Sequence, residues 1–103
     1  MSAYMVIAAE IDDRDRFMLY AQEAARLVTQ FGGQYVVKGA EPQLLEGRPI
    51  GEARLVISRW PDKERALAFW NSAQYAKLRQ IRAGTARVRV ILLEGVDEGG
   101  DAG

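Results

Sequence analysis

The stretch that decides the fold is WPDKERALAFWNSAQY, which runs from residue 60 to residue 75. Pro61 predicts the end of a strand, because proline has no N–H to give to a sheet. Asp62 follows directly, and its carboxylate can accept the free amide protons of a helix's first turn. Apolar residues then recur at helical spacing, namely Ala66, Phe69, Trp70 and Ala73.

Ser72 lies where this helical pattern breaks, and its hydroxyl suits a helix cap. We therefore predict a second helix that begins after Ser72, carries Tyr75, Leu78 and Arg82 on one face and ends at Gly84. Two consecutive short helices cannot enclose a core by themselves. The rest of the chain must supply a sheet for them to cover.

A strand and a longer helix are predicted before this stretch. Residues 4–11 form an apolar run with β-branched side chains, which is typical of a strand. Asp12 and Asp13 can cap the helix that follows, and the pair Gly32-Gly33 can end it, because glycine readily takes a left-handed conformation. The stripe expected to be buried comprises Phe17, Tyr20, Ala24, Leu27, Val28 and Phe31.

Three more strands complete the pattern. The first covers residues 34–38, Gly39 breaks it, and residues 44–46 are a candidate continuation after a bulge or loop. The other two strands cover residues 54–60 and 86–94.

The order of elements is β-α-β-β-α-β, which predicts a single ferredoxin-like α+β domain over residues 1–96. In this fold a four-stranded antiparallel sheet carries its helices on one face. Residues 97–103 are rich in Gly, Asp and Glu, and we expect a disordered tail there.

The second face of the sheet predicts a homodimer. A sheet with one face in water alternates apolar and polar residues, but these strands do not: Val6 and Ala8 oppose Met5 and Ile7, and Val90-Ile91-Leu92-Leu93 is continuous. Two helices cannot cover both faces. We expect the bare faces of two copies to pack together as a dimeric α/β barrel. The alternative, a cover made by the tail, is disfavoured because the tail is polar.

Composition limits the chemistry. The chain has neither cysteine nor histidine, so thiol nucleophiles and the commonest metal and haem ligands are excluded. Fourteen basic residues balance fourteen acidic ones, which disfavours nucleic acid as a partner. No apolar run reaches the length of a membrane span, and no secretory leader pattern is present. We expect a cytoplasmic protein with no metal and no cofactor.

The sequence resembles a family of bacterial proteins, the domain of unknown function numbered thirteen-thirty, within the dimeric α/β-barrel superfamily. The resemblance covers residues 4–96. It is carried by the order and spacing of several short motifs, which are Phe17 and Tyr20, Phe31-Gly32-Gly33-Gln34-Tyr35, Lys38-Gly39-Ala40-Glu41, Leu45-Glu46-Gly47, Arg54-Leu55-Val56-Ile57, Trp60-Pro61, Phe69-Trp70-Asn71-Ser72-Ala73-Gln74-Tyr75 and Glu94-Gly95-Val96.

Two positions depart from the family pattern. Arg59 stands where an acidic residue is usual, and Ala73-Gln74 replaces Pro-Glu. The resemblance implies a ferredoxin-like protomer and a dimer, but it implies no single activity. The superfamily includes cofactor-independent monooxygenases, haem-handling proteins, isomerases and decarboxylases, so fold alone cannot select a function.

The resemblance also implies a ligand site between the sheet and the helices of each protomer. The candidate ligand-binding residues are polar side chains set in apolar elements, namely Tyr20, Tyr35, Lys38, Arg54, Trp60, Ser72, Tyr75 and Arg82. Each has a structural alternative. Tyr20 is more simply a core aromatic, Ser72 a cap and Lys38 a solvated side chain. Arg54 and Arg82 either hold an anion or, as we favour, pair with Glu10, Glu46 or Glu94.

A local excess of positive charge has two interpretations. Lys77, Arg79, Arg82, Arg87 and Arg89 follow one another with no acid between them. Such a run is usually a solvated face, and otherwise it attracts an anionic ligand.

Three functions remain open. The first is a small-molecule-binding homodimer, including a cofactor-independent enzyme that acts on a small aromatic or carboxylate-bearing metabolite. The second is a non-enzymatic ligand-sensing or accessory module, which the lack of an activated nucleophile favours. Haem handling ranks last, because its ligand would have to be Tyr, Met or Lys.

Overall fold

The computed structural model describes residues 2–49 and 51–96, so the predicted tail at 97–103 lies outside the described residues. Three helices and four strands follow one another in the order predicted, with the expected break between the last two helices. They are β1 (Ala3–Ile11), α1 (Arg14–Gln30), β2 (Gln34–Ala40), β3 (Arg54–Trp60), α2 (Lys63–Trp70), α3 (Ala73–Arg82) and β4 (Ala86–Glu94).

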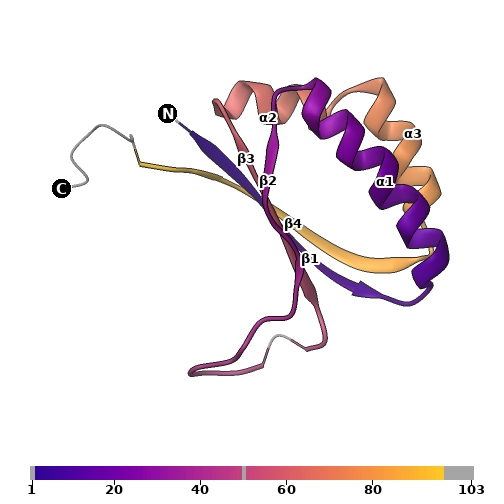
Figure 1. Ribbon diagram of the computed structural model, residues 1–103, viewed down its shortest axis with the longest axis vertical. Coiled ribbons are helices and arrows are strands. Elements are labelled where there is room, and N and C mark those ends of the chain that lie inside the picture. Colours follow the sequence, from indigo (N-terminus) through magenta and orange to yellow (C-terminus); the bar gives the residue numbers. More distant parts are fainter. Residues whose placement is uncertain (1, 50, 97–103) are drawn as a thin grey trace.

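The strands form one antiparallel sheet in the order β2-β3-β1-β4. All three helices lie on the same side of this sheet (Figure 1). The central strand β1 pairs Ala3 with Trp60 of β3 and with Glu94 of β4. This arrangement confirms the predicted ferredoxin-like fold.

Local capping explains where the helices begin. Asp13 accepts a hydrogen bond from the Arg16 amide at 3.2 Å, and Asp62 accepts one from the Arg65 amide at 2.7 Å. Ser72 accepts one from the Tyr75 amide at 3.1 Å. The caps predicted at Asp62 and Ser72 are thus confirmed. Within the described residues, no helix combines the length and the apolar character that crossing a membrane requires.

The second strand differs from the prediction. Gly39 does not end β2, because the strand continues to Ala40 with an irregular register between Lys38 and Ala40. Gly39 takes a φ of +77°, so it makes a β-bulge instead of a break. Residues 44–46 do not continue the strand. They belong to the 41–53 loop, which projects from the sheet (Figure 1).

The core lies between the helices and the sheet and is rich in aromatic side chains. Trp60, Phe69 and Tyr75 are almost fully buried. The ring centre of Phe69 lies 5.1 Å from that of Trp60 and 4.6 Å from that of Tyr75. Gly33 is required at the start of β2, because a Cβ there would lie 2.8 Å from both the Trp60 ring and Val28. The packing of Trp60 and Val28 therefore requires glycine at the connection between α1 and β2.

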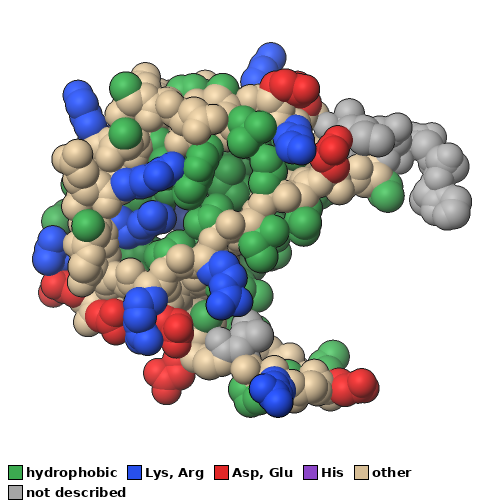
Figure 2. Space-filling view, turned by 180° about the vertical axis from the view of Figure 1, so that it is seen from behind, with side chains coloured by type: hydrophobic (Ala, Val, Ile, Leu, Met, Phe, Trp, Pro, Cys, Tyr) green, Lys and Arg blue, Asp and Glu red, His purple; other side chains and the backbone are tan. Residues whose placement is uncertain are grey.

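The opposite face of the sheet is apolar, and no helix of the described part of the chain covers it. The registers place Val6, Ile57 and Ile91 side by side on it, and Ile91 and Leu93 are 46% and 51% exposed. Figure 2 shows hydrophobic side chains on both sides of the sheet, with a concave outline between the body and the projecting loop. The lack of alternation between apolar and polar residues in these strands thus produces an exposed apolar sheet face.

Candidate functional site

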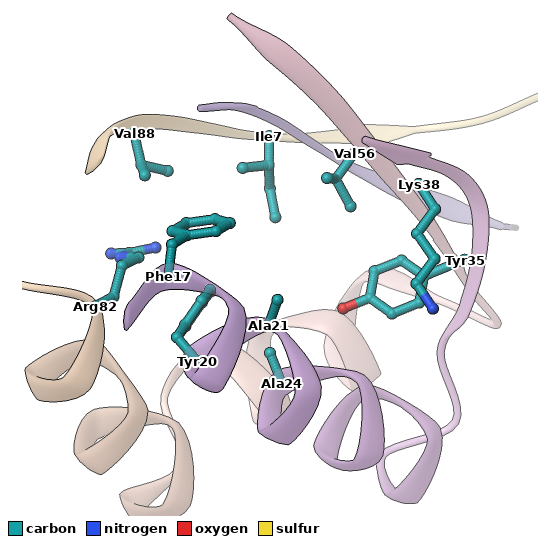
Figure 3. A pocket seen from close by; sticks show the side chains of 10 residues that line it. All are labelled: Ile7, Phe17, Tyr20, Ala21, Ala24, Tyr35, Lys38, Val56, Arg82 and Val88. Atoms are coloured by element: carbon teal, nitrogen blue, oxygen red, sulfur yellow. The ribbon is translucent and has the colours of Figure 1, made fainter. Parts of the chain in front are cut away.

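A cavity of about 70 Å³ lies between α1 and the sheet (Figure 3). Phe17, Tyr20, Ala21 and Ala24 of α1 form one wall, as successive turns of a helix would place them. Ile7, Val56 and Val88 of the sheet form the other wall. Tyr35 and Lys38 of β2 stand at one end, and Arg82 of α3 stands at the other (Figure 3).

The cavity crosses the whole width of the sheet. Its lining takes a residue from every strand, in the spatial order Lys38, Val56, Ile7 and Val88. The register pairs Val56 with both Lys38 and Ile7, so these three side chains form a row across the strands. Three strand spacings span roughly 14 Å. The lining is consequently apolar in its central strands, with polar groups on the β2 side and at Arg82.

Three polar groups are linked beside the Arg82 end. The Tyr20 and Tyr75 hydroxyls share a hydrogen bond of 2.7 Å, and Arg82 Nη1 donates to the Tyr75 oxygen at 3.2 Å. The Arg82 guanidinium carbon also lies 5.3 Å from the centre of the Tyr20 ring. Both tyrosines are buried, at 6% and 1% exposure. The pair therefore satisfies two hydroxyls that would otherwise be costly to bury.

Burial keeps the Tyr20 phenol protonated. It raises the Tyr20 pKa well above the ordinary value, and the adjacent Tyr75 raises it further. Arg82 acts in the opposite direction but does not reverse the shift. Tyr20 is thus a neutral hydroxyl at physiological pH.

Tyr35 presents a second protonated phenol to the cavity. Its oxygen points inward in Figure 3, and it has no hydrogen-bond partner among the residues that the structure describes. Burial, with a smaller effect from Tyr75, raises the Tyr35 pKa to about 12. The Lys38 ammonium lies 5.6 Å from the centre of the Tyr35 ring. This end of the cavity therefore offers a hydroxyl donor beside a cation.

The Lys38 end opens into a larger groove of about 1040 Å³. The groove shares Phe17, Ala21, Lys38 and Val56 with the cavity, so the two spaces adjoin. Both ends of the 41–53 loop help to line it. Lys38 is exposed and stands at the junction, whereas Arg82 is half-buried at the far end.

The lining of the cavity has a single chemical character. Its polar members are two phenols, one ammonium and one guanidinium, and none of the ten residues is acidic. Each of these groups can donate a hydrogen bond, and the two cations can only donate. A carboxylate or another electron-rich oxygen is the group that such a lining complements.

The eight candidate residues fall into three sets. Tyr20, Tyr35, Lys38 and Arg82 line the cavity together, and Tyr75 lies directly behind Tyr20. Arg54 lines the outer groove only.

Trp60 and Ser72 contribute to structure away from the cavity. Trp60 is fully buried, and its indole N–H donates to the Ser58 hydroxyl at 2.9 Å. Ser72 caps α3, and its hydroxyl also donates to the Phe69 carbonyl at 2.8 Å.

The ion pairs that we favoured for two arginines are wrong in detail. Arg54 pairs with Glu41 at 3.4 Å and not with Glu10, Glu46 or Glu94. Arg82 contacts a tyrosine hydroxyl in place of a carboxylate. The sequence could not reveal this, because it is the register of β2 with β3, which pairs Ala40 with Leu55, that brings Glu41 beside Arg54.

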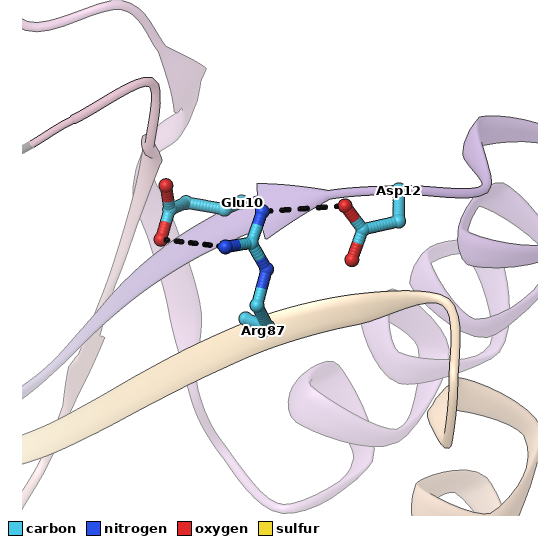
Figure 4. A network of polar contacts seen from close by, with 3 residues as sticks. All are labelled: Glu10, Asp12 and Arg87. Atoms are coloured by element: carbon cyan, nitrogen blue, oxygen red, sulfur yellow. Dashed lines mark hydrogen bonds and ion pairs between the residues drawn. The ribbon is translucent and has the colours of Figure 1, made fainter.

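The basic run does not form one charged patch. Arg79 stacks on Trp70, with 4.0 Å from its guanidinium carbon to the ring centre. Arg87 lies between two acids instead, 3.3 Å from Asp12 and 3.9 Å from Glu10 (Figure 4). The Asp12 hydrogen bond is the main cause of a raised Arg87 pKa. Of this run, Arg82 alone lines the cavity.

Sequence reasoning missed the apolar walls of the cavity. Ile7, Ala21, Val56 and Val88 carry no signal that separates a cavity wall from an ordinary core position. The small side chains Ala21 and Ala24 leave space opposite the sheet, and this was a readable clue. No group of three or more His, Cys, Asp or Glu side chains that could hold a metal occurs in the described ranges.

Solved structures resemble this fold over nearly its full length. A protein of unknown function from Rhodopseudomonas palustris superposes with a TM-score of 0.77 at 14% identity, covering 94% of this chain and 84% of its own. A dimeric ferredoxin-like protein of unknown function from Jannaschia sp. CCS1 gives 0.72 at 14% identity, with coverages of 92% and 100%.

A structure with a described activity is also similar. SnoaB, a cofactor-independent oxygenase from Streptomyces nogalater, gives a TM-score of 0.68 at 11% identity, covering 94% of this chain and 95% of its own. At such identities the likeness shows the fold alone. No curated protein matches the sequence.

Fold and comparisons together place the chain among ferredoxin-like α+β proteins. The chain belongs to the family described as Domain of unknown function (DUF1330), which it matches over residues 2–96. The resemblance found in the sequence is thereby confirmed.

Proposed function

We propose that this protein is a homodimeric small-molecule-binding protein whose ligand is a small aromatic or apolar metabolite bearing a carboxylate. The observation that carries the proposal is the lining of the cavity between α1 and the sheet, whose polar members are two cations and two phenols with no acid. A cationic ligand would repel Arg82 and Lys38, and a neutral ligand could accept their hydrogen bonds without compensating their charge. An anion satisfies both charge and hydrogen bonding.

The volume of the cavity limits the size of the ligand. An apolar cavity of about 150 Å³ holds one benzene ring, and this cavity measures about 70 Å³. It therefore encloses part of a ring-sized ligand, and the remainder extends past Lys38 into the groove.

Calorimetric titration with charge-matched ligands tests the proposal. Benzoate and phenylacetate should bind, and benzylamine, an aromatic cation of similar size, should not. Ala21→Leu fills the junction of cavity and groove and should abolish the benzoate heat. Ala76→Leu makes the same change on the exposed surface of α3 and should leave that heat unchanged. Equal binding of benzoate and benzylamine, or no binding of either carboxylate, would contradict the proposal.

The dimer part of the proposal is supported by the exposed apolar sheet face. Its centre holds Val6, Ile57 and Ile91, and no helix or strand among residues 2–49 and 51–96 covers it. An isologous contact between two such faces buries the apolar surface of both copies at once. The Jannaschia relative, described as dimeric, has the same fold.

An enzymatic role is a second candidate, favoured by the Tyr20–Tyr75–Arg82 chain beside the cavity. A protonated phenol backed by a guanidinium can stabilise negative charge that develops on a bound substrate. Tyr20→Phe would then abolish turnover while leaving ligand affinity within about threefold of wild type. If the bound carboxylates show no turnover in the wild-type protein, the ligand-sensing role stands in place of the enzyme.

A further inference from the structure

The two ends of the cavity are both built to receive an electron-rich group, and this narrows the ligand further. At the β2 end, the Tyr35 hydroxyl points into the cavity with no partner among the described residues, and Lys38 stands next to it. At the other end, Arg82 uses Nη1 for Tyr75. Its guanidinium has five N–H donors, so donors remain for a ligand.

The space between these ends is largely apolar. Its walls are Ile7, Val56 and Val88 on the sheet and Phe17, Ala21 and Ala24 on α1, and the remaining wall residue, Tyr20, shares its hydroxyl with Tyr75. A ligand with one anionic group would fill one end and leave the half-buried donor of the other end, Tyr35 or Arg82, covered without an acceptor, which is unfavourable. Lys38 belongs to the edge strand β2, and Arg82 of α3 lies on the side of Val88 in the opposite edge strand β4 (Figure 3), so one compact head group does not fill both ends.

We propose that the ligand has two acceptor groups, one at each end of a flat apolar body, as in a para-substituted aromatic dicarboxylate or hydroxycarboxylate. This inference rests on the proposed function, since it concerns the same cavity. One acceptor group contacts Arg82, the other contacts the Tyr35 hydroxyl and Lys38, and the apolar body lies between Phe17 and the sheet.

Comparing the affinities of three benzene carboxylates distinguishes the effect of the number of carboxylates from the effect of their positions on the ring. Benzoate has one carboxylate, phthalate has two on adjacent carbons, and terephthalate has two at opposite ends. Terephthalate should bind at least about tenfold more tightly than benzoate, because a charge-assisted hydrogen bond contributes that much or more. Phthalate, with the charge of terephthalate in the wrong geometry, should bind within about threefold of benzoate.

Two variants test which residues cause the preference for terephthalate over benzoate. Tyr35→Phe and Arg82→Gln should each reduce the ratio of terephthalate affinity to benzoate affinity toward one, since the first removes the hydroxyl at one end and the second removes the positive charge at the other. Tyr4→Phe deletes a hydroxyl on the opposite face of the sheet and should keep the wild-type ratio. Tyr35→Phe loses no hydrogen bond to the described residues, so it stays informative even if Arg82→Gln fails to fold.

The possible outcomes distinguish a failure of the two-ended ligand from a failure of the proposed function. If none of the three carboxylates binds, the proposed function fails. If benzoate and terephthalate bind equally well, the function stands and the two-ended ligand is wrong. If terephthalate is preferred but neither variant alters the ratio, the preference arises elsewhere and the inference is again wrong.

Discussion

At the scale of single residues, the buried pair Tyr20 and Tyr75 connects the core to the cavity. These tyrosines are 55 positions apart in the chain and come from α1 and α3. Tyr75 bonds to both Tyr20 and Arg82, whereas Tyr20 bonds only to Tyr75 among the described residues. Deleting the two hydroxyls should therefore have unequal effects.

Tyr20→Phe should lower the free energy of unfolding by about 1 kcal/mol, because the Tyr75 hydroxyl keeps its contact with Arg82. Tyr75→Phe should cost more, roughly 1–3 kcal/mol, because it leaves the Tyr20 hydroxyl buried without a partner. Urea denaturation at one fixed protein concentration measures both values. Equal losses, or a larger loss for Tyr20→Phe, would contradict the described network.

Alkaline titration tests the raised pKa values. The unfolded chain releases its tyrosine protons near pH 10, but folded Tyr35 holds its proton to about pH 12. Between these values the folded state binds more protons than the unfolded state, so stability is complete below pH 10 and falls as the pH rises through 12. In a phenolate absorbance titration, Tyr35→Phe should remove the step near pH 12. A single transition of all four tyrosines near pH 10 would refute the account.

The same shifts predict how binding depends on pH. Tyr20 and Tyr35 remain donors throughout the neutral range. Benzoate affinity should therefore change by less than about twofold between pH 7 and pH 9, as calorimetry at both pH values would show. A steep loss of affinity over this interval would mean that a phenol in the cavity already ionises there.

At the scale of elements, Ser72 separates α2 from α3 and allows the chain to turn. Ser72→Ala removes the cap of α3 and should destabilise the protein by roughly 0.5–2 kcal/mol. Ser72→Asp keeps an acceptor at that position and should recover most of the loss. Urea denaturation of the two variants beside wild type measures this, and equal destabilisation by both would show that the hydroxyl is not acting as a cap.

Elements with local signals were predictable from the sequence. Asp62 and Ser72 lie beside the amides that they cap, so the start of both short helices could be read directly. The bulge at Gly39 could not, because a glycine with positive φ suits a bulge and a strand end equally well. The pairing of β3 with β2 decides between them, and pairing is a long-range property.

Cavity residues were predicted only where their chemistry stood out. Tyr20, Tyr35, Lys38 and Arg82 are polar groups within apolar elements, and the structure places them around one space. Their apolar neighbours, such as Val56 and Val88, come from strands whose order in the sheet the sequence does not state. The space itself depends on how α1 packs across all four strands.

At the scale of the whole molecule, the exposed apolar sheet face predicts the assembly. Sedimentation equilibrium should give twice the chain mass of 11.5 kDa. Ile91→Asp places a charge on that face and should yield a monomer. Leu19→Asp alters a more exposed side chain on α1 and should remain dimeric. A wild-type monomer, or dissociation caused by Leu19→Asp alone, would show that the sheet face is not the interface.

The most direct test of the central claim is a crystal structure of the protein with the tightest-binding aromatic carboxylate. We predict ligand density between α1 and the sheet, with a carboxylate beside Arg82 and the ring between Phe17 and the strands. A ligand bound elsewhere on the protein, with the space around Tyr20, Tyr35 and Arg82 unoccupied, would contradict the account.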